Sequence, residues 1–280
     1  MSNKLASKKL ESKYALSSAF SPNPKNTTKH KKAFIPFITC GYPSIALSEQ
    51  ILYALESNGA DIIEIGIPFS DPIAEGETIQ KSSAKALQNG VHCEEVFDFV
   101  KRVRSKSEVR LAFMTYANII FAYGIESFVA KMASLGVGGL ILADVPYEEK
   151  GVFVSACEKY GIDFITLVAP SSKHRVDMVV RHSSGFIYCV SSLGVTGVRS
   201  EVDNALESMI SKIRKFSSTP IAVGFGISTP TQAKKIASYA DGIIIGSAIM
   251  KICEKNENDE KKCVEEVAKF AREIKNAISK

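Results

Sequence analysis

Eight short apolar runs, separated by segments with a helical pattern, constrain the fold of this 280-residue chain more than any other feature. Hydrophobic side chains follow one another along each run instead of alternating with polar ones. Such runs are typical of parallel strands that are buried on both faces. The predicted strands are Ala33–Thr39, Asp61–Gly66, Arg110–Thr115, Gly139–Ala143, Asp163–Val168, Phe186–Val190, Pro220–Gly224 and Gly242–Ile245.

Helical patterns fill the intervals between these strands. The predicted helices are Ser44–Ser57, Thr78–Gln88, Cys93–Arg104, Ile125–Ser134, Glu148–Tyr160, His174–His182, Asn204–Phe216 and Thr231–Ser238, followed by a terminal amphipathic helix within Glu254–Lys280. Eight β-α units in alternation predict an α/β fold, a (β/α)8 TIM barrel, as a single domain over residues 33–280. A doubly wound open sheet is the alternative, but it usually carries GxGxxG after its first strand, where this chain has CGYPS.

The charge of the chain is concentrated at its N-terminus. Residues 1–32 hold eight lysines and one glutamate, so this segment carries +7, and the rest of the chain −2, of the net +5. The near-neutral remainder argues against a nucleic-acid-binding face, and no apolar run reaches the roughly 18–20 residues of a membrane span. The segment lacks arginine and an apolar core, so a basic arm with a short helix is favoured over a removable targeting peptide.

The six cysteines lack metal-site spacing, which favours reduced thiols in a cytoplasmic protein without a metal.

One carboxylate interrupts the second apolar run. Glu64 stands late in DIIEIG, where its side chain is expected to point into the mouth of the barrel, the usual place of the active site in this fold. Burial raises the pKa of a carboxyl group toward neutrality, and a general acid needs a proton at neutral pH. The residues alone leave a second interpretation open, in which Glu64 is structural and pairs with a lysine or with backbone amides.

Glycine-rich turns follow the last three predicted strands: SSLGVTG at 191–197, GFGIST at 224–229 and GSAIM at 246–250. In TIM barrels the loops after the last strands commonly bind phosphate through backbone amides at a helix N-terminus. The turns therefore predict a small phosphorylated substrate, and simple chain reversal is the alternative for each of them. Four aromatic residues near the same strand ends form either a flat pocket wall or ordinary core: Phe37, Tyr116, Tyr188 and Phe225.

Seven blocks of the chain resemble the signature blocks of the tryptophan synthase alpha chain family. They read IPFITCGYPS, ADIIEIGIPFSDPIAEGETIQ, YANIIFAYGIESF, LADVPYEE, GVTG, GFGIST and GSAI, and they lie between Phe34 and Ile252. The resemblance implies a lyase of L-tryptophan biosynthesis that cleaves indole-3-glycerol phosphate to indole and glyceraldehyde 3-phosphate. It also implies an α2β2 assembly with a beta chain that uses pyridoxal phosphate, and no cofactor or metal on the alpha chain itself.

The resemblance further implies roles for individual residues. Glu64 takes the place of the essential acid/base, and Glu75 takes that of the second carboxylate, which accepts a hydrogen bond from the indole N–H. The other implied contacts are the indole pocket (Phe37, Tyr116, Ile141, Tyr188 and Phe225), the phosphate-binding amides (Gly197, Gly226, Gly246 and Ser247), Thr196 as the loop residue that bonds to the second carboxylate, the partner-facing Asp71 and the orienting Asp144.

Two residues in the loop after the second strand depart from the family pattern. Family members carry Asp where this chain has Glu75, and proline where it has Glu77. A carboxylate misplaced by about 1 Å changes a rate by roughly a hundredfold, so the longer side chain bears on activity. The departures motivate one alternative to an active alpha subunit, a lyase-impaired subunit that mainly activates its beta chain. A stand-alone enzyme, either a lyase that releases indole or another phosphosugar barrel enzyme, is a further alternative.

Overall fold

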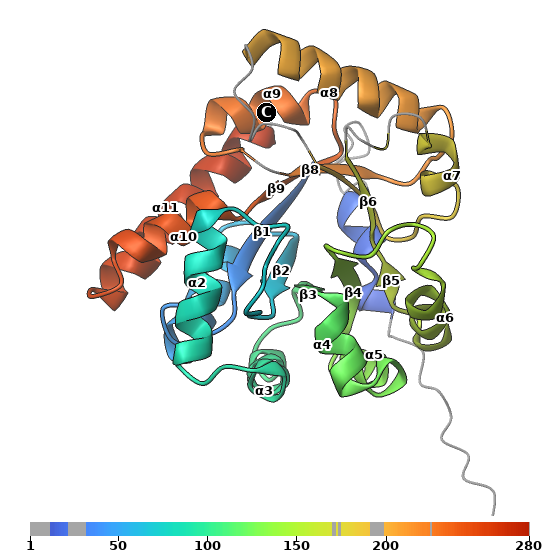
Figure 1. Ribbon diagram of the computed structural model, residues 1–280. Coiled ribbons are helices and arrows are strands. Elements are labelled where there is room, and N and C mark those ends of the chain that lie inside the picture. The colour runs from blue at the N-terminus through green and yellow to red at the C-terminus, as the bar shows by residue number, and fades with distance from the viewer. Residues whose placement is uncertain are drawn as a thin grey trace, which may run out of the picture.

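The strands form one parallel, nearly closed barrel, and the helices surround it (Figure 1). The computed structural model describes residues 12–21, 32–169, 172, 175–190, 199–224 and 226–279. Within them the sheet order is β5-β4-β3-β2-β1-β9-β8-β7-β6, which confirms the predicted TIM barrel. The strands are β1 (Ala33–Thr39), β2 (Ile62–Gly66), β3 (Arg110–Thr115), β4 (Val137–Leu142), β5 (Asp163–Phe164), β6 (Thr166–Val168), β7 (Ile187–Val190), β8 (Ile221–Gly224) and β9 (Gly242–Ile245).

Ile165 divides the fifth predicted strand into β5 and β6. β5 pairs with β4, and β6 pairs with β7 on the other side. Ile165 is buried, and its N–H donates to the carbonyl of Leu140 on β4 at 2.9 Å. The two ends of the sheet are therefore joined by one continuous piece of chain, so the eight predicted strand positions appear as nine strands.

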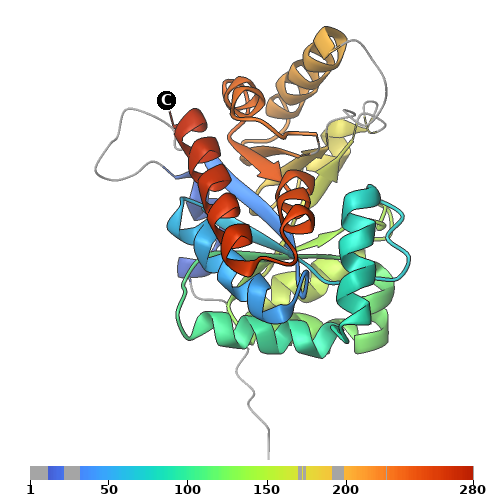
Figure 2. The same cartoon turned by 90° about the vertical axis from the view of Figure 1, so that its left-hand side faces the viewer.

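The helices begin and end within three residues of the predicted boundaries, except that α8 begins five residues before the predicted Asn204. They are α1 (Ile45–Ser57), α2 (Glu77–Gln88), α3 (Cys93–Arg104), α4 (Ala117–Tyr123), α5 (Ile125–Ser134), α6 (Gly151–Tyr160), α7 (Val176–Val180), α8 (Arg199–Arg214), α9 (Pro230–Ala237), α10 (Ser247–Lys255) and α11 (Glu260–Ile278). The pattern did not predict α4 and α10, each of which directly follows a strand or its turn. Figure 2 shows α11, in red, on the outside of the barrel, where it packs against α1, α9 and α10.

The N-terminal end of the barrel is closed by residues 12–21, which form two short 3-10 helices, Ser12–Tyr14 and Leu16–Phe20. The Leu16 side chain fills the space above two glycines of β4, because a Cβ on Gly139 would lie 2.4 Å from it. Beside this segment, the Arg104 guanidinium donates to the carbonyls of Leu135, Ser107, Val109 and Gly136. Arg104 thus satisfies four backbone carbonyls at this end of the barrel.

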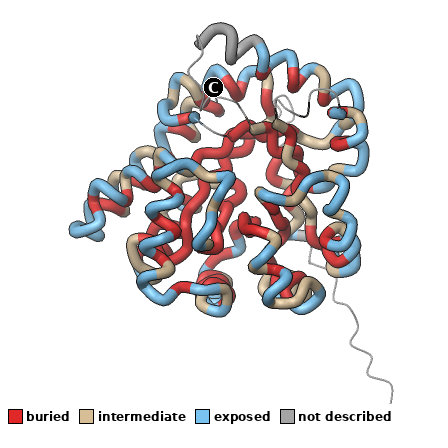
Figure 3. The backbone as a smooth tube through the Cα atoms, viewed as in Figure 1, coloured by how far each residue is buried: buried red, intermediate tan, exposed pale blue. Residues whose placement is uncertain are grey.

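The core lies in the strands and on the inner faces of the helices, as the red segments of Figure 3 show. β1, β2, β4, β8 and β9 are buried at every position, which is the pattern expected of parallel strands covered on both faces. Among the described residues, no helix is long and apolar enough to cross a bilayer.

Candidate active site

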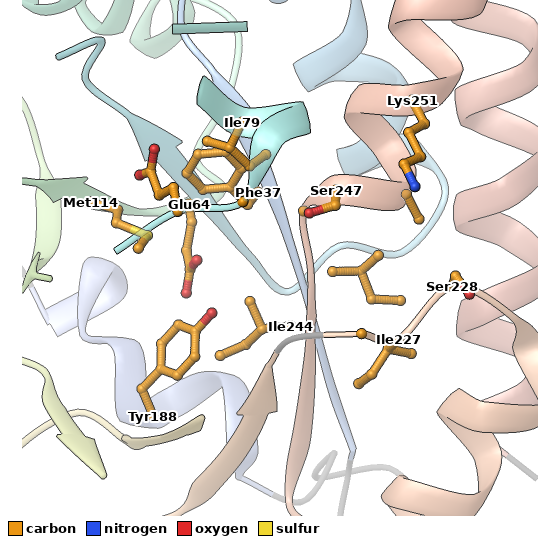
Figure 4. Close-up of a pocket in the computed structure, with 16 residues that line it drawn as sticks. Phe37, Glu64, Ile79, Met114, Tyr188, Ile227, Ser228, Ile244, Ser247 and Lys251 are labelled. Atoms are coloured by element: carbon orange, nitrogen blue, oxygen red, sulfur yellow. The ribbon is translucent and has the colours of Figure 1, made fainter. Parts of the chain in front are cut away.

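A cavity of about 250 Å³ opens at the C-terminal ends of the strands (Figure 4). It is lined by Phe37, Glu64, Glu75, Gly76, Ile79, Met114, Tyr188, Gly226, Ile227, Ser228, Ile244, Ile245, Gly246, Ser247, Ala248 and Lys251. Active sites of TIM barrels lie at this end of the strands. Two chemically different ends can be distinguished in Figure 4, with Glu64 and Tyr188 at one and Ser228, Ser247 and Lys251 at the other.

Glu64 is a fully buried carboxyl group without a hydrogen-bond partner among the described residues. Its exposed fraction is 0%, and neither carboxyl oxygen is bonded. The register places Glu64 beside Phe37 of β1 and Ala112 of β3. Burial raises the pKa of the Glu64 carboxyl well above its usual value. Because it meets neither a lysine nor a backbone amide, the structure does not support the interpretation of Glu64 as a paired structural acid.

Glycines at three strand ends make room for two aromatic rings. A Cβ on Gly66 would lie 2.5 Å from the Phe37 ring, and one on Gly246 would lie 3.1 Å from the same ring. On β8, a Cβ on Gly224 would lie 2.5 Å from the Tyr188 hydroxyl. Burial, followed by the charges of Glu64 and Glu75, raises the pKa of Tyr188 well above its usual value, so its hydroxyl stays protonated. The glycines therefore set the shape of an apolar wall next to the two acids.

The loop between β2 and α2 brings a second carboxyl group, Glu75, to the cavity. Burial raises the pKa of Glu75 to about 7. Tyr116 holds this loop from the side: the Ala74 N–H donates to the Tyr116 hydroxyl at 3.2 Å, and the Tyr116 ring stacks on Phe69 with centroids 4.9 Å apart. The Ala117 N–H donates to the Asp144 carboxylate at 3.0 Å, which fixes the start of α4 next to Tyr116.

The other end of the cavity consists mainly of backbone. Gly246 and Ser247 stand at the N-terminus of α10, where the first amides of a helix have no partner within the helix. At the N-terminus of α9 the corresponding amides are already used, because those of Ser228 and Thr229 donate to the Gln232 side chain at 2.9 and 3.1 Å. The amides that can bind an anion at this end are therefore mainly those at the start of α10, because those at the start of α9 already donate to Gln232.

The structure places the predicted site residues in three groups. Phe37, Glu64, Glu75, Tyr188, Gly226, Gly246 and Ser247 line the cavity together. Tyr116 and Ile141 are buried but do not line it, because Tyr116 faces the loop and the cavity lies nearer to β1, β8 and β9 than to β4. Asp71 is exposed on the loop, and Asp144 follows β4 and accepts from the first amide of α4. Thr196, Gly197 and Phe225 lie outside the described residues.

Sequence reasoning missed several lining residues, among them Met114, Ile79, Ser228 and Lys251. Lys251 carried a signal, since it follows Ser247 by four residues and so lies on the same face of a helix. Recognising it required α10 to be identified as a helix. Met114 pairs with Gly66 across β2 and β3, and this register is not visible in the sequence.

Comparisons with known proteins agree with this geometry. The family model described as tryptophan synthase alpha chain matches residues 24–279. The chain is 42% identical over 250 residues to the tryptophan synthase alpha chain of Lacticaseibacillus casei, covering 89% of this chain and 93% of that one. The corresponding protein of Caldanaerobacter subterraneus is 43% identical over 250 residues, with 89% and 94% covered.

Solved structures show the same likeness. Tryptophan synthase subunit alpha from Legionella pneumophila superposes with a TM-score of 0.82 at 32% identity, covering 89% of this chain and 93% of that one. The subunit alpha from Campylobacter jejuni gives a TM-score of 0.78 at 38% identity, with 87% and 96% covered. The sequence and the fold match one group of proteins over nearly the whole length of the chain, and the chain belongs to the tryptophan synthase alpha chain family.

Proposed function

We propose that this chain is the alpha subunit of a tryptophan synthase and cleaves indole-3-glycerol phosphate to indole and glyceraldehyde 3-phosphate. The reaction is a retro-aldol cleavage, in which the ring carbon that carries the glycerol chain gains a proton and the side-chain hydroxyl loses one. The observation that carries the proposal is Glu64, a fully buried and unpaired carboxyl group in the wall of the cavity.

Glu64 acts as the acid and base of this reaction. Because burial raises its pKa well above the usual value, the carboxyl holds a proton at neutral pH and donates it to the indole carbon at which the chain is cleaved. Once ionised, Glu64 accepts the proton of the side-chain hydroxyl, and the bond between the ring and the glycerol chain breaks. An acid with an ordinary pKa would be ionised before the substrate arrives and could not begin this sequence.

Glu75 stabilises the intermediate in which the indole ring carries positive charge. The loop places its carboxyl group in the same cavity wall as Glu64, where it accepts a hydrogen bond from the indole N–H. The pKa of Glu75 is raised to about 7, so the carboxylate form needed for this role becomes populated as the pH rises through neutrality. Glu75 lines the cavity although its side chain is longer than the aspartate of the family.

The phosphate of the substrate lies at the other end of the cavity, on the amides of Gly226, Gly246 and Ser247. Phosphate esters carry close to two negative charges at pH 7, and a helix N-terminus favours such an anion. The indole lies between the two ends, against the Phe37 ring. We further propose that the chain works in the cytoplasm in an α2β2 assembly with a beta chain, with Asp71 on the partner-facing loop.

The purified chain incubated with indole-3-glycerol phosphate, alone and with its beta chain, tests this function. We expect equal amounts of indole and glyceraldehyde 3-phosphate, faster with the beta chain present. The double variant Glu75→Asp/Glu77→Pro should change turnover little. A large gain of turnover in that variant would instead indicate that the wild-type chain is a lyase-impaired activator. High turnover of the wild-type chain without any beta chain would indicate a stand-alone lyase. If neither the wild-type chain nor the double variant cleaves the substrate, the proposal is refuted.

A further inference from the structure

The cavity wall carries a single positively charged side chain among the residues that the structure describes. Of the lining residues, Glu64 and Glu75 are acids and Lys251 is the cation. Glu64 lies toward one end of the cavity, and Lys251 lies at the end formed by Ser247 and Ser228 (Figure 4). The buried acid and the lysine are therefore separated along the cavity, and a dianion is favoured at the end that holds the lysine.

Lys251 shares a helix with the amides proposed to bind phosphate. It follows Ser247 by four residues in α10, so the two side chains lie one above the other on one face of the helix. In Figure 4 the Lys251 side chain extends from α10 toward the space between Ser247 and Ser228. No carboxylate in the described part of the chain pairs with Lys251 within 4 Å in the structure, so its ammonium group can receive an anion without breaking an ion pair.

An acidic residue at the start of α2, Glu77, interacts electrostatically with Lys251. The hydrogen bond and charge of Lys81 lower the pKa of Glu77, and the charge of Lys251 lowers it further. Glu77 is already paired with Lys81 at 2.8 Å. It follows the lining residues Glu75 and Gly76 directly in the chain, and α2 packs against α10. Lys251 thus lies between the phosphate end of the cavity and the helix that continues from the loop carrying Glu75.

We infer that Lys251 is a substrate-binding residue, whose ammonium group pairs with the phosphate of the substrate from the α2 side of the cavity. The inference rests on the proposed function and adds a charged side chain to a phosphate site otherwise made of backbone amides. Glu77 is paired with Lys81, so its charge acts on Lys251 only at longer range and leaves the ammonium group available to the phosphate. The phosphate is remote from the bond that breaks, so Lys251 holds substrate and transition state equally and acts on KM.

The substitution Lys251→Gln in the full-length chain tests this role, with Lys255→Gln as the matched control. Lys255 is one turn further along α10 and does not line the cavity; it lies 3.9 Å from Glu266. Steady-state cleavage is measured with the beta chain present, together with inhibition by inorganic phosphate. We expect Lys251→Gln to raise KM, and the inhibition constant of phosphate, roughly fivefold with kcat nearly unchanged, as for one partly solvated charge-assisted contact. Lys251→Arg should restore most of the affinity.

The variants separate this inference from the proposed function. If the wild-type chain cleaves the substrate and Lys251→Gln has the KM of Lys255→Gln, Lys251 does not bind phosphate and the inference is refuted. If the wild-type chain does not cleave the substrate, the proposed function itself fails. A Lys251→Gln variant with lowered kcat and unchanged KM and phosphate inhibition would also refute the role assigned here. A thermal melt of each variant confirms that the chain is folded.

Two further measurements check that charge is the cause. Glu77→Gln removes a negative charge that acts on Lys251 at longer range, so it should lower KM slightly while Lys251→Gln raises it. The difference in KM between the wild-type chain and Lys251→Gln should shrink at high ionic strength, because salt screens interactions between partly exposed charges. An unchanged difference across salt concentrations, or a KM raised by Glu77→Gln, would contradict an electrostatic contact.

Discussion

Asp61 and Glu64 are two buried carboxyl groups three residues apart, and the barrel treats them in opposite ways. Asp61 precedes β2 at the closed end of the barrel, where it accepts from the Phe34 N–H at 2.8 Å and from the Lys275 ammonium at 2.5 Å. Glu64 stands within β2 and has no partner among the described residues. A paired buried acid stabilises a fold, whereas an unpaired one costs stability and keeps its reactivity.

The same contrast extends to the two ends of the barrel. At the closed end, Leu16 fills the space over the glycines of β4 and Arg104 satisfies four carbonyls. At the open end, glycines leave space for the rings of Phe37 and Tyr188, and the first amides of α10 have no partner within the helix. The first arrangement serves stability and the second binding, and the substitutions below test this division.

The largest effect is expected for Glu64→Gln, which keeps the shape of the side chain but removes its acidic proton. Turnover should fall about a thousandfold, within the range of general acid–base catalysis, while KM for indole-3-glycerol phosphate stays close to that of the wild type. Steady-state kinetics measures both quantities. Asp61→Asn is the matched control, because the same chemical change at the closed end should leave the turnover of the folded protein intact. Full turnover by Glu64→Gln would remove the role assigned to this residue.

The second largest effect is a loss of stability in Asp61→Ala. This substitution leaves Lys275, whose side chain is only 20% exposed, without its carboxylate, and we expect it to cost about 3 kcal/mol of the free energy of unfolding. Denaturant unfolding measures this cost, and turnover below the transition should equal that of the wild type. A loss of activity without a loss of stability would show that the closed end also serves catalysis.

A smaller effect should appear in the pH dependence of stability. The folded state raises the pKa of Glu64 above its unfolded value, so folded protein holds this proton to higher pH than unfolded protein does. The protonated Glu64 contributes its full share of stability below about pH 4.5, where the unfolded chain also holds the proton. The free energy of unfolding then falls as the pH rises from there toward the pKa of Glu64 in the folded protein. Glu64→Gln should therefore melt a few degrees above the wild type at high pH, with a gap that narrows at low pH. Parallel melting curves at all pH values would contradict the buried, unpaired state of Glu64.

The smallest effect is expected for Tyr116→Phe, which removes the hydroxyl that accepts from Ala74 in the loop carrying Glu75. One hydrogen bond of this kind contributes about 0.5–1.5 kcal/mol, so kcat/KM should fall about two- to tenfold. Tyr123→Phe is the control, since it removes a hydroxyl from the same helix that bonds to Glu94 at 2.8 Å. Equal kinetics for the two variants would show that Tyr116 does not position the loop.

Much of the fold was predictable because each strand is buried on both faces and each long helix has one apolar side. α3 and α5 have the predicted bounds, and β1 and β3 agree at both ends. The interruption at Ile165 was not predictable, because the local sequence is equally apolar on either side and only barrel closure changes its pairing partner. α10 was missed because its first residues, within 246–250, were interpreted as a glycine-rich turn after the last strand.

The sequence by itself determined the order of the elements, the glycine turns and the acid within an apolar strand, because these follow from local periodicity and residue chemistry. Only the tertiary structure decided that Asp61 is paired while Glu64 is not. The pairing depends on α11, which packs beside the first strands and brings Lys275 to Asp61, 214 positions away in the sequence. It also decided that Tyr116 supports the loop and that Lys251 reaches the cavity. The Asp61 and Tyr116 contacts join residues distant in sequence, and no local pattern encodes them. The four-residue spacing of Lys251 from Ser247 is a local signal, but it becomes informative only once α10 is known to be a helix.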